Sequence, residues 1–242
     1  MMATDCLFRD DSYLRECEAR VVGVTDKGIV LDRTVLYATS GGQPGDTGIL
    51  VTANGAEIPI ANAIYLDAAK TGIAHVPATD AAQIAPGDTV AARIDWDKRH
   101  ARMRMHTALH LLSAVLPYAV TGGSVGDGDG RLDFDIPDAG LDKDDITAKV
   151  NEMIAADAAV TSSWITDDEF TANPALIKTM SVKPPLGNGR VRLITIATAD
   201  RQFDLQPCGG THVKSTGEIG KIAVTQIEKK GKQNRRVRIA FA

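Results

Sequence analysis

The chain has 242 residues with 44% hydrophobic and 24% charged content and a formal net charge of −4, as expected of a soluble globular protein that buries a core without disulfide staples. The chain has no run of about 18 apolar residues, so no membrane span is predicted. The N-terminal residues also lack the apolar centre of a signal peptide. Three cysteines are too few and too odd in number for a disulfide scaffold, so we expect a cytoplasmic protein with reduced thiols.

The charge is unevenly distributed along the chain. Residues 1–90 hold 6 basic and 12 acidic side chains, whereas residues 91–242 hold 21 and 19. Two basic clusters lie in the second part, "KRHARMR" at 98–104 and "KKGKQNRRVR" at 229–238. Such clusters suit phosphates. A solvated helix face and a charged edge strand explain the same patterns, and composition alone favours that simpler interpretation.

Short strands are predicted throughout residues 1–90. Residues 18–37 alternate apolar and polar positions around a "TDKG" turn, and a glycine-rich loop at 38–50 leads into a further strand. Asn54-Gly55 is a hairpin signal. Several short strands with frequent turns predict a small β-barrel or sandwich for this part of the chain.

The pattern changes to α+β in residues 91–242. Residues 95–117 predict one long helix, with Asp95 as its N-cap and Pro117 as its end. The rest follows as a glycine-rich loop, a strand near Arg131–Ile136, helices at 142–160 and 169–180 (the second interrupted at Pro174), a strand at 190–199 and a closing hairpin at 221–242. We therefore predict a second, α+β domain with an antiparallel sheet.

The long helix carries the sequence "HTALH". His106 and His110 are four residues apart and so share one helix face, which is the spacing that two imidazoles need to hold one small cation. A lone pair of this kind is weak evidence, because a histidine is also a common core residue.

A second pair lies in "QPCGGTH". Cys208 and His212 flank two glycines that allow a tight turn. Together the two pairs give three imidazoles and one thiolate, a natural zinc set, although about a hundred residues separate them. A nucleophilic Cys208 with His212 as its base is the alternative, but no residue in the sequence is an obvious partner to orient that histidine.

These motifs also resemble a known family. "HTALH" followed by "CGGTHVKSTGEIG" closely resembles the editing domain of alanyl-tRNA synthetases, and a related domain occurs in threonyl-tRNA synthetases. The resemblance covers most of residues 91–242, including "RLDFDI" and "NRRVRIAFA", and "ATSGGQPGDTG" is similar to the glycine motif of the small β-domain that precedes the editing domain. The chain thus looks like a free-standing alanyl-tRNA editing protein of the AlaX type, in its longer form.

The resemblance implies a zinc-dependent hydrolase of mischarged tRNA(Ala) in the cytoplasm. Ser-tRNA(Ala) is the expected substrate, Gly-tRNA(Ala) is a further one, and the oligomeric state stays open. The zinc ligands carried over by the motifs are His106, His110, Cys208 and His212. Alternatives are a zinc-stabilised tRNA-binding module without catalysis and a metallohydrolase acting on a small ester or amide.

Further site residues are expected around these ligands. Thr107 lies between the two histidines and is the candidate for substrate contact, while helix packing explains it equally well. Asp204 is a candidate partner for a zinc-bound imidazole. Other candidates are backbone N–H donors for an oxyanion at Gly209 and Gly210, a loop that approaches the substrate at Gly41 and Gly42, and tRNA phosphate contacts at Arg235 and Arg236.

Overall fold

The computed structural model describes residues 3–79, 84–136, 140–173, 176 and 189–242, and it divides into two compact units. The units comprise residues 1–100 and 101–242, so the division falls inside helix α1 (Trp96–Val115). The division of functions between residues 1–90 and 91–242 stays a prediction. None of the helices in the described segments has the length and apolar character that crossing a membrane requires.

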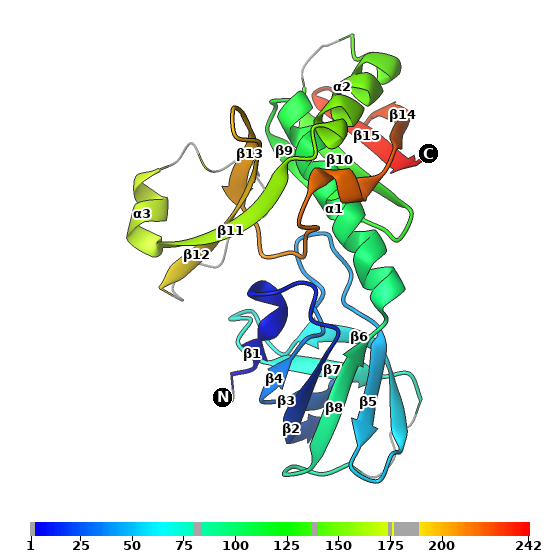
Figure 1. Ribbon diagram of the computed structural model, residues 1–242, viewed down its shortest axis with the longest axis vertical. Coiled ribbons are helices and arrows are strands. Elements are labelled where there is room, and N and C mark those ends of the chain that lie inside the picture. Colours follow the sequence, from blue (N-terminus) through cyan, green and yellow to red (C-terminus); the bar gives the residue numbers. More distant parts are fainter. Residues whose placement is uncertain (1–2, 80–83, 137–139, 174–175, 177–188) are drawn as a thin grey trace. The chain divides into compact units, whose positions relative to one another are not determined.

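The first unit is a closed barrel of antiparallel strands (Figure 1), which confirms the predicted small β-barrel. Around the barrel the strands are β2 (Glu16–Thr25), β3 (Gly28–Leu31), β7 (Ile73–Pro77), β6 (Glu57–Tyr65), β5 (Gly48–Thr52) and β8 (Thr89–Ile94). A short parallel pair, β1 (Asp5–Cys6) and β4 (Arg33–Thr34), and a 3-10 helix at Leu7–Arg9 complete the unit.

The predicted turns fix the register of the barrel. Residues 25–28 join β2 to β3, with Thr25 paired to Gly28. Gly55 closes the β5–β6 hairpin with a φ of 83°, a value that glycine adopts without strain. Inward-facing aliphatic side chains fill the interior and include Val21, Ile29, Leu31, Leu50, Ile58, Ile60, Ile73 and Val90.

A buried ion pair ties the start of α1 to the barrel loops. Asp95 caps α1 as predicted, since its Oδ1 accepts the N–H of Lys98 at 3.3 Å. One turn into the helix, Arg99 is fully buried and donates through Nε to Oδ2 of Asp46 at 2.9 Å. The same guanidinium donates to the carbonyl of Ser12 at 2.9 Å. A buried charge is tolerated only with such partners.

The second unit combines two antiparallel sheets with helices (Figure 1). One sheet has the order β14 (Ile222–Lys229), β15 (Asn234–Phe241), β10 (Asp129–Asp135) and β9 (Val120–Val125). The other has the order β11 (Ala159–Thr166), β12 (Arg190–Ala197) and β13 (Gln202–Pro207). The helices are α1, α2 (Lys143–Ala155), α3 (Asp167–Ala172) and a 3-10 turn at Thr216–Ile219. This arrangement confirms the predicted α+β class.

Helix α1 is buried on all sides in this unit. One face carries Met105 and Leu109, which pack on β10 at Gly130, where a Cβ atom would meet the Met105 side chain at 2.9 Å. On the other face His106 and His110 are also less than a tenth exposed. Two imidazoles buried together need polar partners.

One predicted loop was wrong, and the bounds of two predicted helices differ from those in the structure. The glycine-rich stretch after α1 forms strand β9, because Gly122 and Gly123 leave room for the side chains of Asp133 and Leu132 on β10. The second helix ends at Ala155 rather than near residue 160, because Asp157 takes a left-handed φ of 49° and the chain turns into β11. The third helix begins at Asp167, two residues earlier than predicted, and positions 174, 175 and 177–180 of the prediction lie outside the described residues.

The buried ion pair gives a stability prediction. We expect Arg99→Met to lower the free energy of unfolding by about 3–5 kcal/mol, because Asp46 is left charged, buried and without its partner. Arg93→Met is the control, since Arg93 pairs with Glu16 on an exposed surface, and it should cost less than about 1 kcal/mol. Urea unfolding followed by circular dichroism measures both, and equal effects would contradict the prediction.

Candidate metal centre

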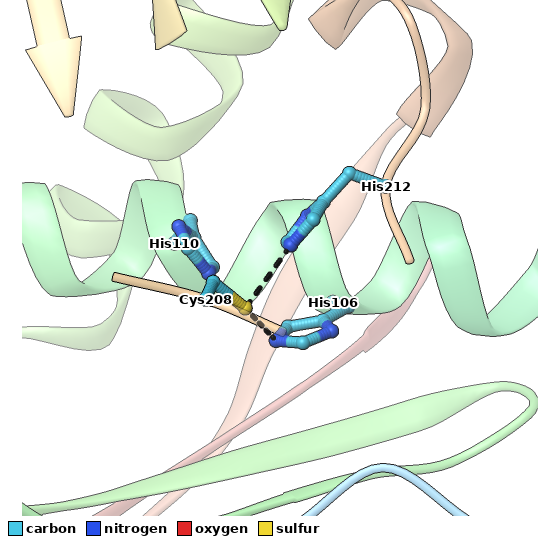
Figure 2. Close-up of side chains that lie close together, drawn as sticks. All are labelled: His106, His110, Cys208 and His212. Carbon is cyan, nitrogen blue, oxygen red and sulfur yellow. Dashed lines mark hydrogen bonds between the residues drawn. The ribbon is translucent and has the colours of Figure 1, made fainter. Parts of the chain in front are cut away.

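The two predicted pairs meet in the second unit (Figure 2). Their ligand atoms all lie within 4.8 Å of one another. Sγ of Cys208 lies 3.5 Å from Nε2 of His106 and 3.3 Å from Nε2 of His212. Bonds of about 2.0 Å to nitrogen and 2.3 Å to sulfur around a tetrahedral zinc ion imply a nitrogen–sulfur separation of about 3.5 Å. The cluster therefore has the donors and the spacing of a zinc site.

Helix α1 supplies two of the imidazoles. His106 and His110 project from one face a single turn apart, with ring centroids separated by 5.3 Å. The ring of His212 lies 4.4 Å from that of His106 and 4.6 Å from that of His110. Three imidazoles thus surround one thiol in the arrangement that Figure 2 shows.

The loop that carries Cys208 is held by Arg192 of the neighbouring strand. The backbone N–H of Cys208 donates to the carbonyl of Arg192 at 3.1 Å. In return, Nη1 of Arg192 donates to the carbonyls of Cys208 at 3.3 Å and Gly210 at 2.8 Å. The Arg192 side chain is buried, so these charge-assisted bonds are strong ones. They fix the loop on both sides of Gly209.

The hydroxyl of Thr107 joins α1 to the segment after the cysteine. It donates to the carbonyl of Met103 at 2.9 Å, one turn back on the helix. Its oxygen also lies 3.1 Å from Nδ1 of His212 and accepts the N–H of Val213 at 3.3 Å. Because the hydroxyl hydrogen is used on Met103, Nδ1 of His212 must be the donor. The lone pair of His212 is then on Nε2, which faces the thiol.

Asp204 fixes the tautomer of His110 in the same way as Thr107 fixes that of His212. Its Oδ2 lies 2.8 Å from Nδ1 of His110 and accepts Nε2–H of Gln206 at 2.8 Å. The Asp204 carboxylate is almost fully buried. A carboxylate that accepts Nδ1–H leaves Nε2 as the ligand atom of that histidine. The predicted contact between Asp204 and an imidazole of the cluster is therefore confirmed.

The protonation states of Cys208 and His212 favour ligation of a cation, whereas that of His110 opposes it. Burial and the charge of His106 lower the pKa of His212 to about 3, so this imidazole is neutral. Burial opposes ionisation of Cys208, but His106 and His212 outweigh it and hold its pKa well below the ordinary value. Burial also lowers the pKa of His110, yet its bonds to Asp204 and Cys208 raise it to about 9. A cation must therefore displace one proton from His110.

The structure places all four glycines of the predicted site, and the oxyanion role expected of Gly209 and Gly210 stays a prediction. Gly210 directs its N–H to Sγ of Cys208 at 3.4 Å, so that N–H serves the thiolate. Gly209 is exposed, and a Cβ there would meet nothing within 4 Å. Gly41 and Gly42 lie in the first unit with φ values of 58° and 83°. Their contact with substrate stays a prediction.

The arginines predicted to contact tRNA are both engaged within the sheet of the second unit. Arg236 holds both carboxylate oxygens of Asp133, at 2.7 and 2.9 Å. Arg235 is buried and donates to the carbonyl of Asn234 at 3.2 Å. These contacts give both side chains a structural role, and their contact with tRNA stays a prediction.

Sequence reasoning missed two residues that support the centre. Gln206 lies two positions before Cys208, so strand alternation places it on the cysteine's side of β13. Arg192 is a charged residue within the apolar strand β12, and a charge in that position indicates a buried partner.

Comparison with known proteins gives consistent matches over both units. Residues 191–238 match the family described as the threonyl and alanyl tRNA synthetase second additional domain, and residues 8–98 match class II (A) tRNA synthetases. The chain is 33% identical over 92% of its length to the alanine–tRNA ligase of Pyrobaculum aerophilum, of which it covers 25%.

Two shorter relatives match along their whole length. The chain is 36% identical to the alanyl-tRNA editing protein AlaX-M of Methanosarcina acetivorans, with 97% of each chain covered. It is 31% identical to the AlaX-M protein of Saccharolobus solfataricus, again with 97% of each covered. At this identity and with nearly complete coverage of both chains, this chain belongs to the AlaX-M family of alanyl-tRNA editing proteins.

Proposed function

We propose that this chain is a zinc-dependent hydrolase that removes a wrong amino acid from tRNA(Ala). The bond broken is the ester between the amino acid and the terminal ribose, and one water is consumed. Ser-tRNA(Ala) is the first proposed substrate and Gly-tRNA(Ala) the second. The observation that carries the proposal is the cluster of His106, His110, Cys208 and His212, whose ligand atoms lie within 4.8 Å, in a chain with editing proteins as relatives.

The donor set fits zinc better than the other common cations. Magnesium and calcium prefer oxygen ligands, whereas three imidazoles and a thiolate are typical of zinc. When bound there, zinc supplies a Lewis acid that polarises the ester carbonyl or holds the substrate amine. The residues around the cluster determine which atoms of the ligands are available for it.

Three residues position the ligands. Thr107 holds His212 with Nε2 toward the cluster, Asp204 does so for His110, and Arg192 fixes the carbonyls on both sides of the Gly209 loop. All three side chains are less than a tenth exposed. Because buried hydrogen bonds resist reorganisation, the ligands are held in place before substrate arrives.

Editing must spare Ala-tRNA(Ala), which is the correct product of the synthetase. Serine differs from alanine by one hydroxyl group, and a hydrophobic pocket cannot strongly reject an isostere that merely adds such a group. A second, hydrolytic site that binds the hydroxyl supplies the missing discrimination. This is the physical reason for proposing serine as the preferred target.

The metal assignment predicts a specific effect of the thiolate. We expect Cys208→Ala to lower zinc content from one ion per chain to well below half and to abolish deacylation, because one of four ligands is lost. Cys17→Ala is the matched control, since Cys17 is a half-buried barrel cysteine outside the cluster. Mass spectrometry of the native protein measures zinc content. Full zinc occupancy in Cys208→Ala would contradict the assignment.

The Thr107 contacts predict a positioning effect that can be separated from substrate contact. We expect Thr107→Val to weaken zinc binding by about 10–100-fold, because Nδ1–H of His212 loses its acceptor, while Thr107→Ser retains it. Competition with a chelating dye measures the zinc affinity. If Thr107→Val keeps wild-type zinc affinity but loses serine selectivity, the side chain contacts substrate as the sequence suggested.

The substrate proposal is tested by deacylation. We expect the zinc-loaded chain to release serine from Ser-tRNA(Ala) at least about tenfold faster than alanine from Ala-tRNA(Ala), because a site that hydrogen-bonds the serine hydroxyl is left with an unpaired polar group when alanine is bound. Glycine release is measured in the same assay with labelled amino acids. A chain that binds zinc and tRNA(Ala) but leaves all three esters intact is a binding module without catalysis.

A further inference from the structure

Two cations of the barrel gather around Tyr65. Nη2 of Arg9 donates to the phenolic oxygen of Tyr65 at 3.2 Å. Nζ of Lys70 lies 5.6 Å from the centroid of the same ring and donates to Oγ of Ser40 at 2.8 Å. All four side chains are partly exposed. We call Arg9, Ser40, Tyr65 and Lys70 the Tyr65 cluster.

Neither cation has a carboxylate partner among the residues that the structure describes. The ion pairs of the barrel join other side chains, such as Arg93 with Glu16 and Arg99 with Asp46. The carboxylate next to Lys70 on its own loop, Asp67, accepts backbone N–H groups of Ala69 and Lys70 instead. Because both cations contact the same Tyr65 side chain, an anion near this phenol would be attracted to both of them.

The loop beside the Tyr65 cluster is shaped for close approach. Ser40 and Gln43 exchange backbone hydrogen bonds at 3.1 and 2.9 Å across Gly41 and Gly42. Both glycines have positive φ values, both are exposed, and a Cβ at Gly41 would meet nothing within 4 Å. Such a turn presents backbone N–H groups without side chains over them, which is how backbone nests bind anions.

Lys70 itself adopts a costly conformation. Its φ of 56° is in the left-handed region, which non-glycine residues other than asparagine and aspartate seldom occupy. Strained residues persist where the surrounding structure holds them, and they concentrate at binding sites. In this conformation the ammonium group of Lys70 donates to Ser40 at the start of the glycine turn.

From these contacts we infer that the Tyr65 cluster and the Gly41–Gly42 turn form a phosphate-binding site, with a phosphodiester of the tRNA as its ligand. Lys70 has two further ammonium hydrogens and Arg9 has four further N–H donors for phosphate oxygens. The choice of tRNA rests on the proposed function. A free phosphate ion is the other source of the same chemistry, and the experiment distinguishes the two.

Salt dependence of tRNA binding is the direct test. Uncharged tRNA(Ala) is titrated with the full chain at several potassium chloride concentrations, using Arg9→Gln, Lys70→Asn and the double variant. Asparagine is chosen at position 70 because it removes the charge and tolerates a positive φ. Each single change should lower the slope of log affinity against log salt by about one and weaken binding roughly eightfold at about 0.1 M salt.

Two controls separate charge from structure. Arg93→Gln removes a barrel cation that already has a carboxylate partner, so it should leave the slope within error of wild type. Lys70→Arg keeps the charge and should restore the slope that Lys70→Asn loses. Melting curves by circular dichroism confirm that each variant remains folded.

The outcomes separate this inference from the proposed hydrolase activity. If wild type deacylates Ser-tRNA(Ala) but the variants keep the wild-type slope, the phosphate site is wrong and the hydrolase stands. If the slope falls as expected but no ester is cleaved, the phosphate site stands and the hydrolase fails. If wild type does not bind tRNA(Ala), both are overturned.

A second arm uses inorganic phosphate at constant ionic strength, followed by calorimetry. The inference is supported if wild type binds phosphate weakly, the double variant loses this binding, and the slope of log tRNA affinity against log salt also falls. Both results together indicate a site that binds a phosphate group of the tRNA. Phosphate binding that is lost while the tRNA slope is unchanged assigns the site to a free ion and overturns the inference.

Discussion

The arrangement of the metal-ligand cluster depends on one hydroxyl group, that of Thr107, which joins α1 to the segment around His212. Three polar groups contact this hydroxyl: the carbonyl of Met103, Nδ1 of His212 and the N–H of Val213. Because the hydroxyl donates to its own helix, it can only accept from the distant segment. Because the hydroxyl oxygen accepts from His212, it selects the tautomer of that imidazole. Together with the bond from Val213, this contact attaches a segment about a hundred residues away to α1.

The surroundings of the cluster follow from that attachment. Burial makes each charge costly, so the centre is stable only when every polar group is paired. Asp204 on β13 accepts from His110 and from Gln206, and Arg192 on β12 donates to the loop carbonyls. The strands therefore support the cluster with side chains that their positions in the sheet place beside it, and β13 leads directly into Cys208. The lowered pKa of Cys208 and the neutral imidazole of His212 suit a bound cation, whereas His110 must lose a proton before it can bind one.

The sequence predicted the ligands but only part of their support. His106 and His110 share a helix face by spacing alone, and the glycines between Cys208 and His212 indicate a turn, so four donors were readable. The contacts of Arg192 were not, because they depend on the register between β12 and β13. Likewise Arg235 and Arg236 appear equivalent in a basic run, whereas strand alternation buries one and pairs the other with Asp133. Strand β9 was missed because its glycines are explained only by the side chains opposite them.

The central claim is that three imidazoles and one thiolate hold a single zinc ion. X-ray absorption at the zinc edge of the zinc-loaded chain tests it most directly, because nitrogen and sulfur ligands differ in bond length. The account predicts three nitrogen neighbours at about 2.0 Å and one sulfur at about 2.3 Å. A shell of nitrogen and oxygen alone, with no sulfur, would contradict it.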